Sequence, residues 1–281
     1  MRKISSLLLG LALIFALALQ PTGQASLAPE TLVVASGPLR LQALLWRPPG
    51  NGPFPAVIFN HGSYSTREPL TPDDPAALGP VFARHGYVFL FLFRQGIGLS
   101  VDQGTADGDL MDSALAADGV EGRNRVQLEL LESEELNEAL AGGAFLRALP
   151  NVDTRRVAVS GHSFGGSLSL LVAGQDTTLR AAVVFGAAGA SWEQSPALRA
   201  RLLAAVNQTT APILFIHAAN DYSIAPGEAL AREMQRLGKP HQLKIYPSFG
   251  RTSREGHNFL YHSVRTWDRD VFAFLDAHLK H

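Results

Sequence analysis

Apolar residues recur along the chain in short unbroken runs, and segments with helical spacing separate these runs. A short apolar run bounded by turn residues is typical of a strand buried on both faces of a parallel sheet. Such runs lie at residues 55–60, 87–93, 156–160, 181–185, 212–217 and 242–246, after a predicted hairpin of residues 31–36 and 39–46. Helical spacing appears at residues 75–85, 163–173, 196–207, 227–237 and 259–279. This alternation predicts a single α/β domain with a mostly parallel, doubly wound sheet and flanking helices.

Residues 94–122 interrupt this pattern, because they are rich in Gly and Asp and contain few large apolar side chains. A long segment without regular structure is usually functional or mobile. We therefore predict a loop that borders the functional site. The next residues, 124–149, carry apolar side chains at helical spacing and predict one long helix packed on the sheet.

The N-terminus has the pattern of a targeting segment. Arg2 and Lys3 precede an apolar run of thirteen residues, 7–19, and small residues follow at 23–25. A membrane-spanning helix needs roughly 20 apolar residues, so we expect no stable membrane anchor. The pattern predicts a signal peptide at residues 1–25 that is removed near Ala25. The catalytic domain would then be residues 26–281 of an exported protein, periplasmic or secreted. A buried N-terminal helix is the alternative.

Composition narrows the chemistry that the chain can perform. The formal net charge of the 281 residues is −1, which leaves no large basic surface and argues against a nucleic-acid partner. The chain has no Cys. Disulfides, thiolate metal sites and a cysteine nucleophile are therefore excluded. We also expect no cofactor.

One serine lies in a sequence context that suits a nucleophile. The segment VSGHSFGG, residues 159–166, follows a predicted strand and opens a predicted helix. A Gly-x-Ser-x-Gly turn between a strand and a helix projects its serine above the sheet. The helix N-terminus also supplies backbone N–H groups for a developing oxyanion. We predict Ser163 as the nucleophile and the N–H of Phe164 as an oxyanion donor. A plain structural turn is the alternative.

A serine nucleophile needs a histidine base, and the base needs a carboxylate that orients it. His257 follows the last predicted strand, and Asp221 follows the strand at residues 212–217. The resulting chain order of Ser163, Asp221 and His257 is the order expected of this architecture. The competing histidines and carboxylates are His162, His217, His262, Asp176 and Glu193.

Backbone groups after the strand at residues 55–60 are candidates for the rest of the oxyanion hole. There the N–H of Ser63 or Tyr64 would join that of Phe164, while His61 is predicted to be structural. Arg94 begins the long loop and is a candidate substrate contact, with a structural ion pair as the alternative. Trp192 is a candidate pocket wall.

Together, the His-Gly loop at residues 61–62, GHSFGG, the aspartate after a late strand and the late histidine resemble the α/β-hydrolase superfamily. The single domain and the segment RQGIGLS, residues 94–100, are similar to dienelactone-hydrolase-like and prolyl-oligopeptidase-related serine esterases. Dienelactone hydrolases proper use a cysteine nucleophile, which this chain lacks. The peptidases carry a large propeller domain, for which this chain has no room.

These observations predict a serine hydrolase that cleaves small-molecule carboxylic esters through an acyl-enzyme. Cleavage of a small-peptide amide by the same triad is one alternative, and a non-catalytic binding protein of this fold is another. No metal site is predicted. The acidic segment containing Asp102, Asp107, Asp109 and Asp112 is interpreted as a solvated active-site loop, with a calcium loop as the alternative.

Overall fold

The computed structural model describes residues 27–280. The signal peptide predicted for residues 1–25 and its cleavage site lie outside the described residues. Within them, one sheet contains eight strands in the order β1-β2-β4-β3-β5-β6-β7-β8. The strands are β1 (Glu30–Ser36), β2 (Leu39–Trp46), β3 (Phe54–Asn60), β4 (Val88–Leu92), β5 (Val152–His162), β6 (Ala181–Phe185), β7 (Ile213–Ala218) and β8 (His241–Tyr246).

Strands β1, β2 and β4 pair antiparallel, and every other pair in the sheet is parallel. The central strands β3, β4, β6 and β7 are almost wholly buried because helices cover both faces of the sheet. This arrangement confirms the predicted mostly parallel sheet and its N-terminal hairpin. In a parallel sheet the carboxyl ends of the strands meet at one edge, where ligands bind.

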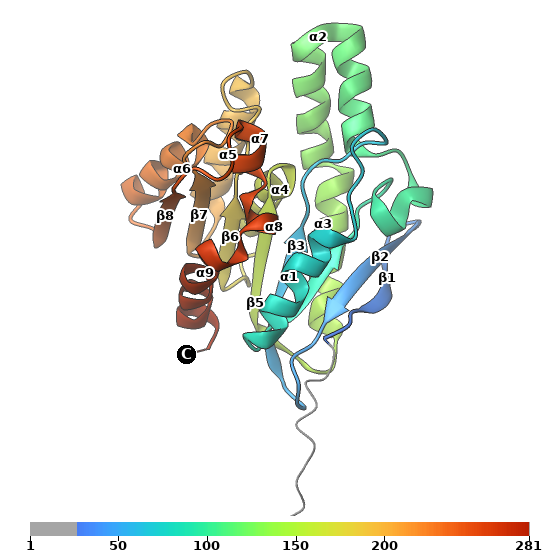
Figure 1. Cartoon of the computed structure of the whole chain (residues 1–281), viewed down its shortest axis with the longest axis vertical. Coiled ribbons are helices and arrows are strands. Elements are labelled where there is room, and N and C mark those ends of the chain that lie inside the picture. Colours follow the sequence, from blue (N-terminus) through green and yellow to red (C-terminus); the bar gives the residue numbers. More distant parts are fainter. Residues whose placement is uncertain (1–26, 281) are drawn as a thin grey trace, which may run out of the picture.

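The helices divide into two layers around the sheet (Figure 1). They are α1 (Asp73–Arg84), α2 (Asp107–Glu132), α3 (Glu134–Ala148), α4 (Phe164–Gln175), α5 (Pro196–Gln208), α6 (Ala225–Arg236), α7 (Ser253–His257), α8 (Phe259–His262) and α9 (Val264–Leu279). Apolar side chains of α3 to α6 form the core on one face. Those of α1, α8 and α9 form the core on the other. In residues 27–280 no helix has the length and apolarity needed to cross a membrane.

The prediction of a loop at residues 94–122 is wrong, because much of this segment is helical. A short 3₁₀ helix, Gly98–Gln103, is followed by α2, which reverses at Gly119, where φ is +67°. The two halves of α2 run side by side and project beyond the sheet (Figure 1), and we call them the arm. Most side chains of the arm's outer part are exposed. A solvent-exposed helix carries no wide apolar stripe, so the sequence pattern did not show it.

Two predicted helices are shorter than expected. The helix predicted at residues 124–149 is interrupted at Ser133, where α2 ends and α3 begins. The helix predicted at residues 259–279 is likewise divided at Ser263 into α8 and α9. Both interruptions turn the chain at a serine, a residue type that competes with the helix for backbone hydrogen bonds.

Helix α1 approaches the sheet most closely where Gly79 faces Trp46. The indole of Trp46 is buried, with 2% of its surface exposed. A Cβ atom on Gly79 would overlap the Trp46 ring. The absence of a side chain therefore sets the distance between this helix and β2.

We predict that Gly79→Ala destabilises the fold by about 2 kcal/mol, because overpacking a rigid buried ring costs more than the helix gains. The matched control is Gly143→Ala in α3, where the nearest atom to an added Cβ is the Arg147 guanidinium at 3.6 Å. Alanine is better than glycine in a helix by about 1 kcal/mol, so the control is expected to be neutral or stabilising. Urea unfolding measures both, and equal midpoints would contradict the packing argument.

Candidate active site

Ser163 lies at the sharp turn between β5 and α4. Its φ of 56° is positive, a strained conformation for a residue with a side chain. Its N–H donates to the carbonyl oxygen of Phe185 at 2.8 Å, which ties the turn to β6. A Cβ atom on Gly165 would overlap the backbone carbonyls of Asn60 and His61. The turn therefore requires glycine beside the serine, and it has the strand–turn–helix context predicted from VSGHSFGG.

Asp221 and His257 come together at the same edge of the sheet. Asp221 follows β7, and His257 is the last residue of α7, whose start at Thr252 is set by a capping box with Glu255. The ring Nδ1 of His257 and Oδ1 of Asp221 are 2.6 Å apart. Gly186, with φ of +58°, leaves room for both side chains, since a Cβ there would lie 3.1 Å from the His257 ring.

The carboxylate of Asp221 also binds a second imidazole, which the sequence did not predict. Oδ2 of Asp221 lies 2.8 Å from Nδ1 of His217, a buried residue of β7. Burial alone raises the pKa of Asp221, but the hydrogen bonds from His217 and His257 outweigh it and hold that pKa well below its ordinary value. Asp221 is therefore an anion at neutral pH. The only sequence signal for this contact is that His217 ends a strand four residues before Asp221.

Ser163 and His257 line one cleft of about 600 Å³. The lining residues are Gly62, Ser63, Tyr64, Arg67, Glu68, Pro69, Arg123, His162, Ser163, Ala190, Tyr222, Arg254, His257 and Asn258. Within the described residues the Ser163 hydroxyl makes no hydrogen bond with the His257 ring. Such contacts often tighten only when substrate is bound. The cleft therefore brings a strained serine and a carboxylate-bound histidine to one volume.

His162, the neighbour of Ser163, faces this cleft rather than away from it. Its Nε2 lies 2.9 Å from the carbonyl oxygen of His257. Burial, followed by the nearby His257, lowers the pKa of His162 to about 3. His162 is therefore uncharged at neutral pH and contacts the backbone of the predicted base. His262, the other nearby rival, lies in α8 and is exposed.

Two oxyanion donors were predicted in the loop after β3, and one of them is already engaged in a hydrogen bond. The N–H of Tyr64 donates to Oδ1 of Asp107 at 3.0 Å, which removes Tyr64 from the predicted set. Among the described residues, the N–H groups of Ser63 and Phe164 have no acceptor. A Cβ on Gly62 would lie 3.5 Å from Cβ of Ser163, so the loop runs directly beside the serine. The donor pair narrows to Ser63 and Phe164.

Arg94 lies against the loop after β3 and does not line the cleft. Its side chain is fully buried and donates to the carbonyl oxygens of His61, at 2.8 Å, and Gly62, at 3.1 Å. It forms ion pairs with Asp107 and Glu135. The prediction that Arg94 contacts substrate is therefore wrong, because the side chain is fully buried among protein groups. Arg94 instead takes part in a structural ion pair, which was the alternative prediction.

Trp192 also lies away from the cleft. Its side chain is buried, with 6% exposed, in the core that α3 to α6 form. From this segment Ala190 lines the cleft, and Trp192 does not. The tight turn that follows Gly186, with Trp192 N–H bonded to the Ala188 carbonyl at 2.8 Å, turns the indole inward.

Two carboxylates of the acidic segment, those of Asp107 and Asp109, accept hydrogen bonds from backbone N–H groups. Asp107 accepts from Tyr64 and, at 2.7 Å, from its neighbour Gly108, while Asp109 accepts from the N–H and hydroxyl of Thr66. These bonds tie the base of the arm to the loop after β3. In residues 27–280 no cluster of three His, Asp or Glu side chains is arranged for a metal ion.

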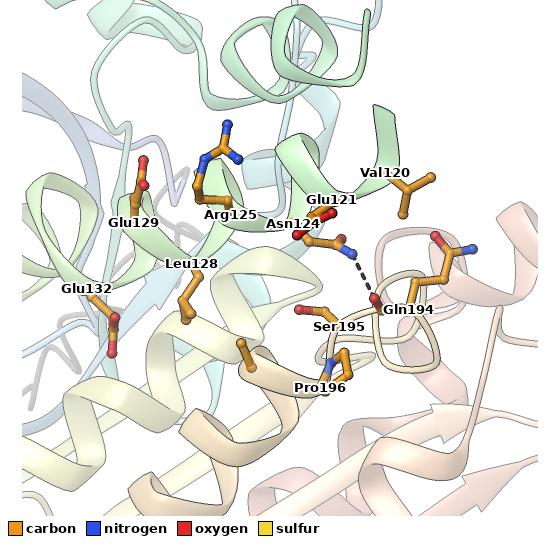
Figure 2. A pocket seen from close by; sticks show the side chains of 11 residues that line it. Val120, Glu121, Asn124, Arg125, Leu128, Glu129, Glu132, Gln194, Ser195 and Pro196 are labelled. Carbon is orange, nitrogen blue, oxygen red and sulfur yellow. Dashed lines mark hydrogen bonds between the residues drawn. The ribbon is translucent and has the colours of Figure 1, made fainter. Parts of the chain in front are cut away.

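A larger cavity of about 850 Å³ lies on the other side of the arm, between α2 and the start of α5. Figure 2 shows its mixed lining, including Asn124, whose amide donates to the Gln194 carbonyl at 2.8 Å. Ser195, the one hydroxyl there, accepts from the N–H of Leu198 and caps α5. No histidine lines this cavity, so it lacks the nucleophile–base pair that the smaller cleft contains.

Comparison with known proteins now places the chain. Residues 41–278 match the model of the dienelactone hydrolase family. The chain belongs to the dienelactone hydrolase family. It is thus an α/β-hydrolase, as the resemblance of its motifs implied. No curated protein matches it in sequence.

Solved structures similar to this dienelactone hydrolase family member share its fold at low sequence identity. A dienelactone hydrolase from Anabaena variabilis has 20% identity and a TM-score of 0.60, with 90% of this chain and 99% of that one covered. Est1E from Butyrivibrio proteoclasticus has 16% identity and a TM-score of 0.59, with 89% and 99% covered. Pyrococcus horikoshii acylaminoacyl peptidase has 18% identity and a TM-score of 0.62 over 90% of this chain. The chain spans only 42% of that peptidase's length.

Next to the loop after β3, this family member buries three carboxyl groups around a single guanidinium group. Arg94 is surrounded by Asp107, Glu135 and Glu138, and Oε2 of Glu138 accepts from the N–H of Gln95 at 2.9 Å. Burial, which the nearby Asp107 reinforces, raises the pKa of Glu138 to about 7. Burial also raises the pKa of Glu135 well above its ordinary value. The cluster therefore retains protons that the unfolded chain releases.

The raised pKa of Glu138 predicts how stability depends on pH. Between the ordinary carboxyl value of 4.5 and about 7, the folded state binds a proton that the unfolded state does not. The contribution of Glu138 to stability is therefore fully present below pH 4.5 and is lost as pH rises through this window. Glu138→Gln keeps an acceptor for Gln95 and removes the titration, so its unfolding free energy is expected to fall less steeply from pH 4.5 to 7. Urea unfolding at several pH values tests this, and equal slopes would refute it.

Proposed function

We propose that this protein is a serine esterase in which Ser163, His257 and Asp221 form the catalytic triad. The observation that carries the proposal is the 2.6 Å contact between His257 and Asp221 at a cleft that the strained Ser163 also lines. A buried carboxylate bound to Nδ1 leaves Nε2 of the ring as the free base. Family membership supports a hydrolase, and the absence of Cys leaves serine as the nucleophile.

The proposed reaction has two halves. Nε2 of His257 takes the Ser163 proton as Oγ attacks the ester carbonyl, and the N–H groups of Ser63 and Phe164 hold the oxyanion. The protonated ring then gives its proton to the departing alcohol, which leaves an acyl-enzyme. Water enters, loses a proton to His257 and attacks the acyl carbon. Ser163 regains its proton when the acid departs, so no co-reactant other than water is needed.

Substitution of the triad tests this proposal directly. Ser163→Ala and His257→Ala are each expected to lower kcat for p-nitrophenyl butyrate by at least about a thousandfold, with folding unchanged by circular dichroism. The exposed His262→Ala is the matched control and keeps wild-type turnover. A fluorophosphonate should label the wild type and not Ser163→Ala. Labelling without ester turnover would favour the small-peptide amide alternative, and wild type without labelling or turnover would refute the serine hydrolase.

We further propose that the preferred esters carry a negative charge. The cleft lining contains Arg67, Arg123 and Arg254 but only one acidic side chain, Glu68, which pairs with Arg254 at 2.7 Å. Within the described residues, Arg67 and Arg123 form no ion pair. The same two arginines line an adjoining cavity of about 370 Å³, which Glu68 and Asp112 also line, so they stand where the two volumes meet. Arg123 donates to the Ser191 hydroxyl at 3.5 Å. A carboxylate reaching this junction would find two guanidinium groups that have no ion-pair partner within the described residues.

Two ester substrates whose acyl chains have equal length but different charge separate the effect of acyl charge from that of acyl size. We expect the wild type to have a higher kcat/KM for the p-nitrophenyl monoester of succinate than for the butyrate ester. The double variant Arg67→Gln and Arg123→Gln is expected to lower this ratio about tenfold, with the preference screened by added salt. Arg232→Gln, an exposed arginine of α6, is the control. An unchanged ratio in the double variant would exclude these side chains as the source of selectivity.

A further inference from the structure

His217 contacts the proposed triad, yet the proposed reaction makes no use of it. It is 2% exposed, and its Nδ1 lies 2.8 Å from Oδ2 of Asp221. The other oxygen, Oδ1, accepts from Nδ1 of His257 at 2.6 Å and from the N–H of Tyr222 at 2.7 Å. Each oxygen of this buried carboxylate is thus held by an imidazole. Because a carboxylate only accepts, both rings carry their proton on Nδ1.

Helix α6 fixes the His217 ring in place. A Cβ on Gly227, in its first turn, would lie 2.6 Å from Nε2 of His217, so the helix backbone packs directly against the imidazole. The ring therefore cannot swing away from Asp221. Rotation of the Asp221 carboxyl group, normally a soft torsion, would break the bond to His217 as well as the bond to His257.

The hydrogen bond also changes how strongly Asp221 attracts a proton on His257. A donor at Oδ2 stabilises negative charge there and reduces the charge that Oδ1 presents to His257. Loss of that donor would strengthen the attraction for protonated His257. Free enzyme would then lose its base at a higher pH. Loss of the donor is expected to act in the same direction whether His217 is neutral or cationic, because both forms donate from Nδ1.

We propose that His217 is a positioning residue that aims Asp221 at His257 and sets the acid limb of the pH–activity profile. This inference rests on the proposed function. His217 itself touches neither substrate nor the reacting atoms, so it acts through Asp221 alone.

Other ionisable groups face this network from several elements, and their effects must stay constant in the test. His162 packs against the His257 ring with ring centres 4.7 Å apart, and its lowered pKa keeps it neutral. Tyr222 lies 4.9 Å from the same ring. The Arg254–Glu68 pair and Arg123 lie farther out in the cleft lining. None of these side chains contacts His217 by a hydrogen bond within the described chain.

Two substitutions separate the hydrogen bond from the bulk of the ring. His217→Asn places an amide nitrogen on Cγ, where the imidazole has Nδ1, and so retains a donor to Oδ2. His217→Leu fills similar space without a donor. Ile216→Val, the neighbouring buried position on β7, is a packing control, because Ile216 belongs to the core beneath α1, α8 and α9 and makes no side-chain hydrogen bond.

The test measures kcat/KM against pH for each variant, with thermal unfolding recorded in parallel. His217→Leu is expected to move the acid limb to higher pH by about half a unit to one unit and to lower the plateau kcat/KM about tenfold, with KM little changed. His217→Asn should keep the wild-type acid limb. NMR titration of the His257 ring without substrate should show the same displacement in His217→Leu, which provides a readout independent of turnover.

An acid limb and plateau in His217→Leu that match the wild type would overturn the inference. So would equal changes in His217→Asn and His217→Leu, since these would reflect packing. If His217→Leu does not fold, His217→Gln replaces it, because its amide is one carbon farther out and misses Oδ2. Wild-type turnover that survives Ser163→Ala would instead contradict the proposed function, so the two failures are distinguishable.

Discussion

Strand β5, helix α4 and the loop after β3 meet at Ser163 with no room for a side chain between them. A Cβ on Gly161 would overlap the Gly165 carbonyl, and one on Gly165 would overlap the carbonyls of Asn60 and His61. This contact forces the chain through a positive φ at Ser163 and holds the loop carrying Ser63 against it. The remaining parts of the site are arranged around this one close approach.

Two buried charge networks support that contact from opposite sides. Beneath the loop, Arg94 binds two loop carbonyls and is paired with Asp107 and Glu135. Beside the serine, Asp221 is held by His217 and His257. Burying a charge costs several kcal/mol unless it is paired and hydrogen-bonded. Both networks therefore permit few alternative arrangements, and this rigidity is what the proposed oxyanion site requires.

The arm connects these networks to the cleft. Asp107, its first residue, accepts from the backbone of Tyr64 and pairs with Arg94. Its returning half brings Arg123 into the cleft lining. One helical element thus anchors the loop after β3 through Asp107 and places the positively charged Arg123 in the cleft lining. The arm's outer part is exposed, whereas Met111, Leu130 and Leu131 nearer the sheet join the core.

The sheet, its hairpin and the strand–turn–helix at Ser163 were predictable from sequence, because each depends on local periodicity and on glycines within a few residues. The positions of Asp221 and His257 followed from the shared edge of a parallel sheet. The family resemblance rested on the same short motifs, and the match over residues 41–278 confirms it.

The remaining features depend on contacts between distant parts of the chain. Whether Tyr64 offers its N–H depends on Asp107, 43 residues away, and Arg94 is turned from the cleft by carbonyls 32 and 33 residues before it. The first half of the arm has too little apolar surface to produce a periodic signal. Sequence alone thus determined which groups stand at the carboxyl edge of the sheet, since the alternation of strands and helices and the chemistry of the turns are local. Only the tertiary structure decided which donors remain free and which charges are buried, because hydrogen-bond partners and desolvation are set by the folded neighbours.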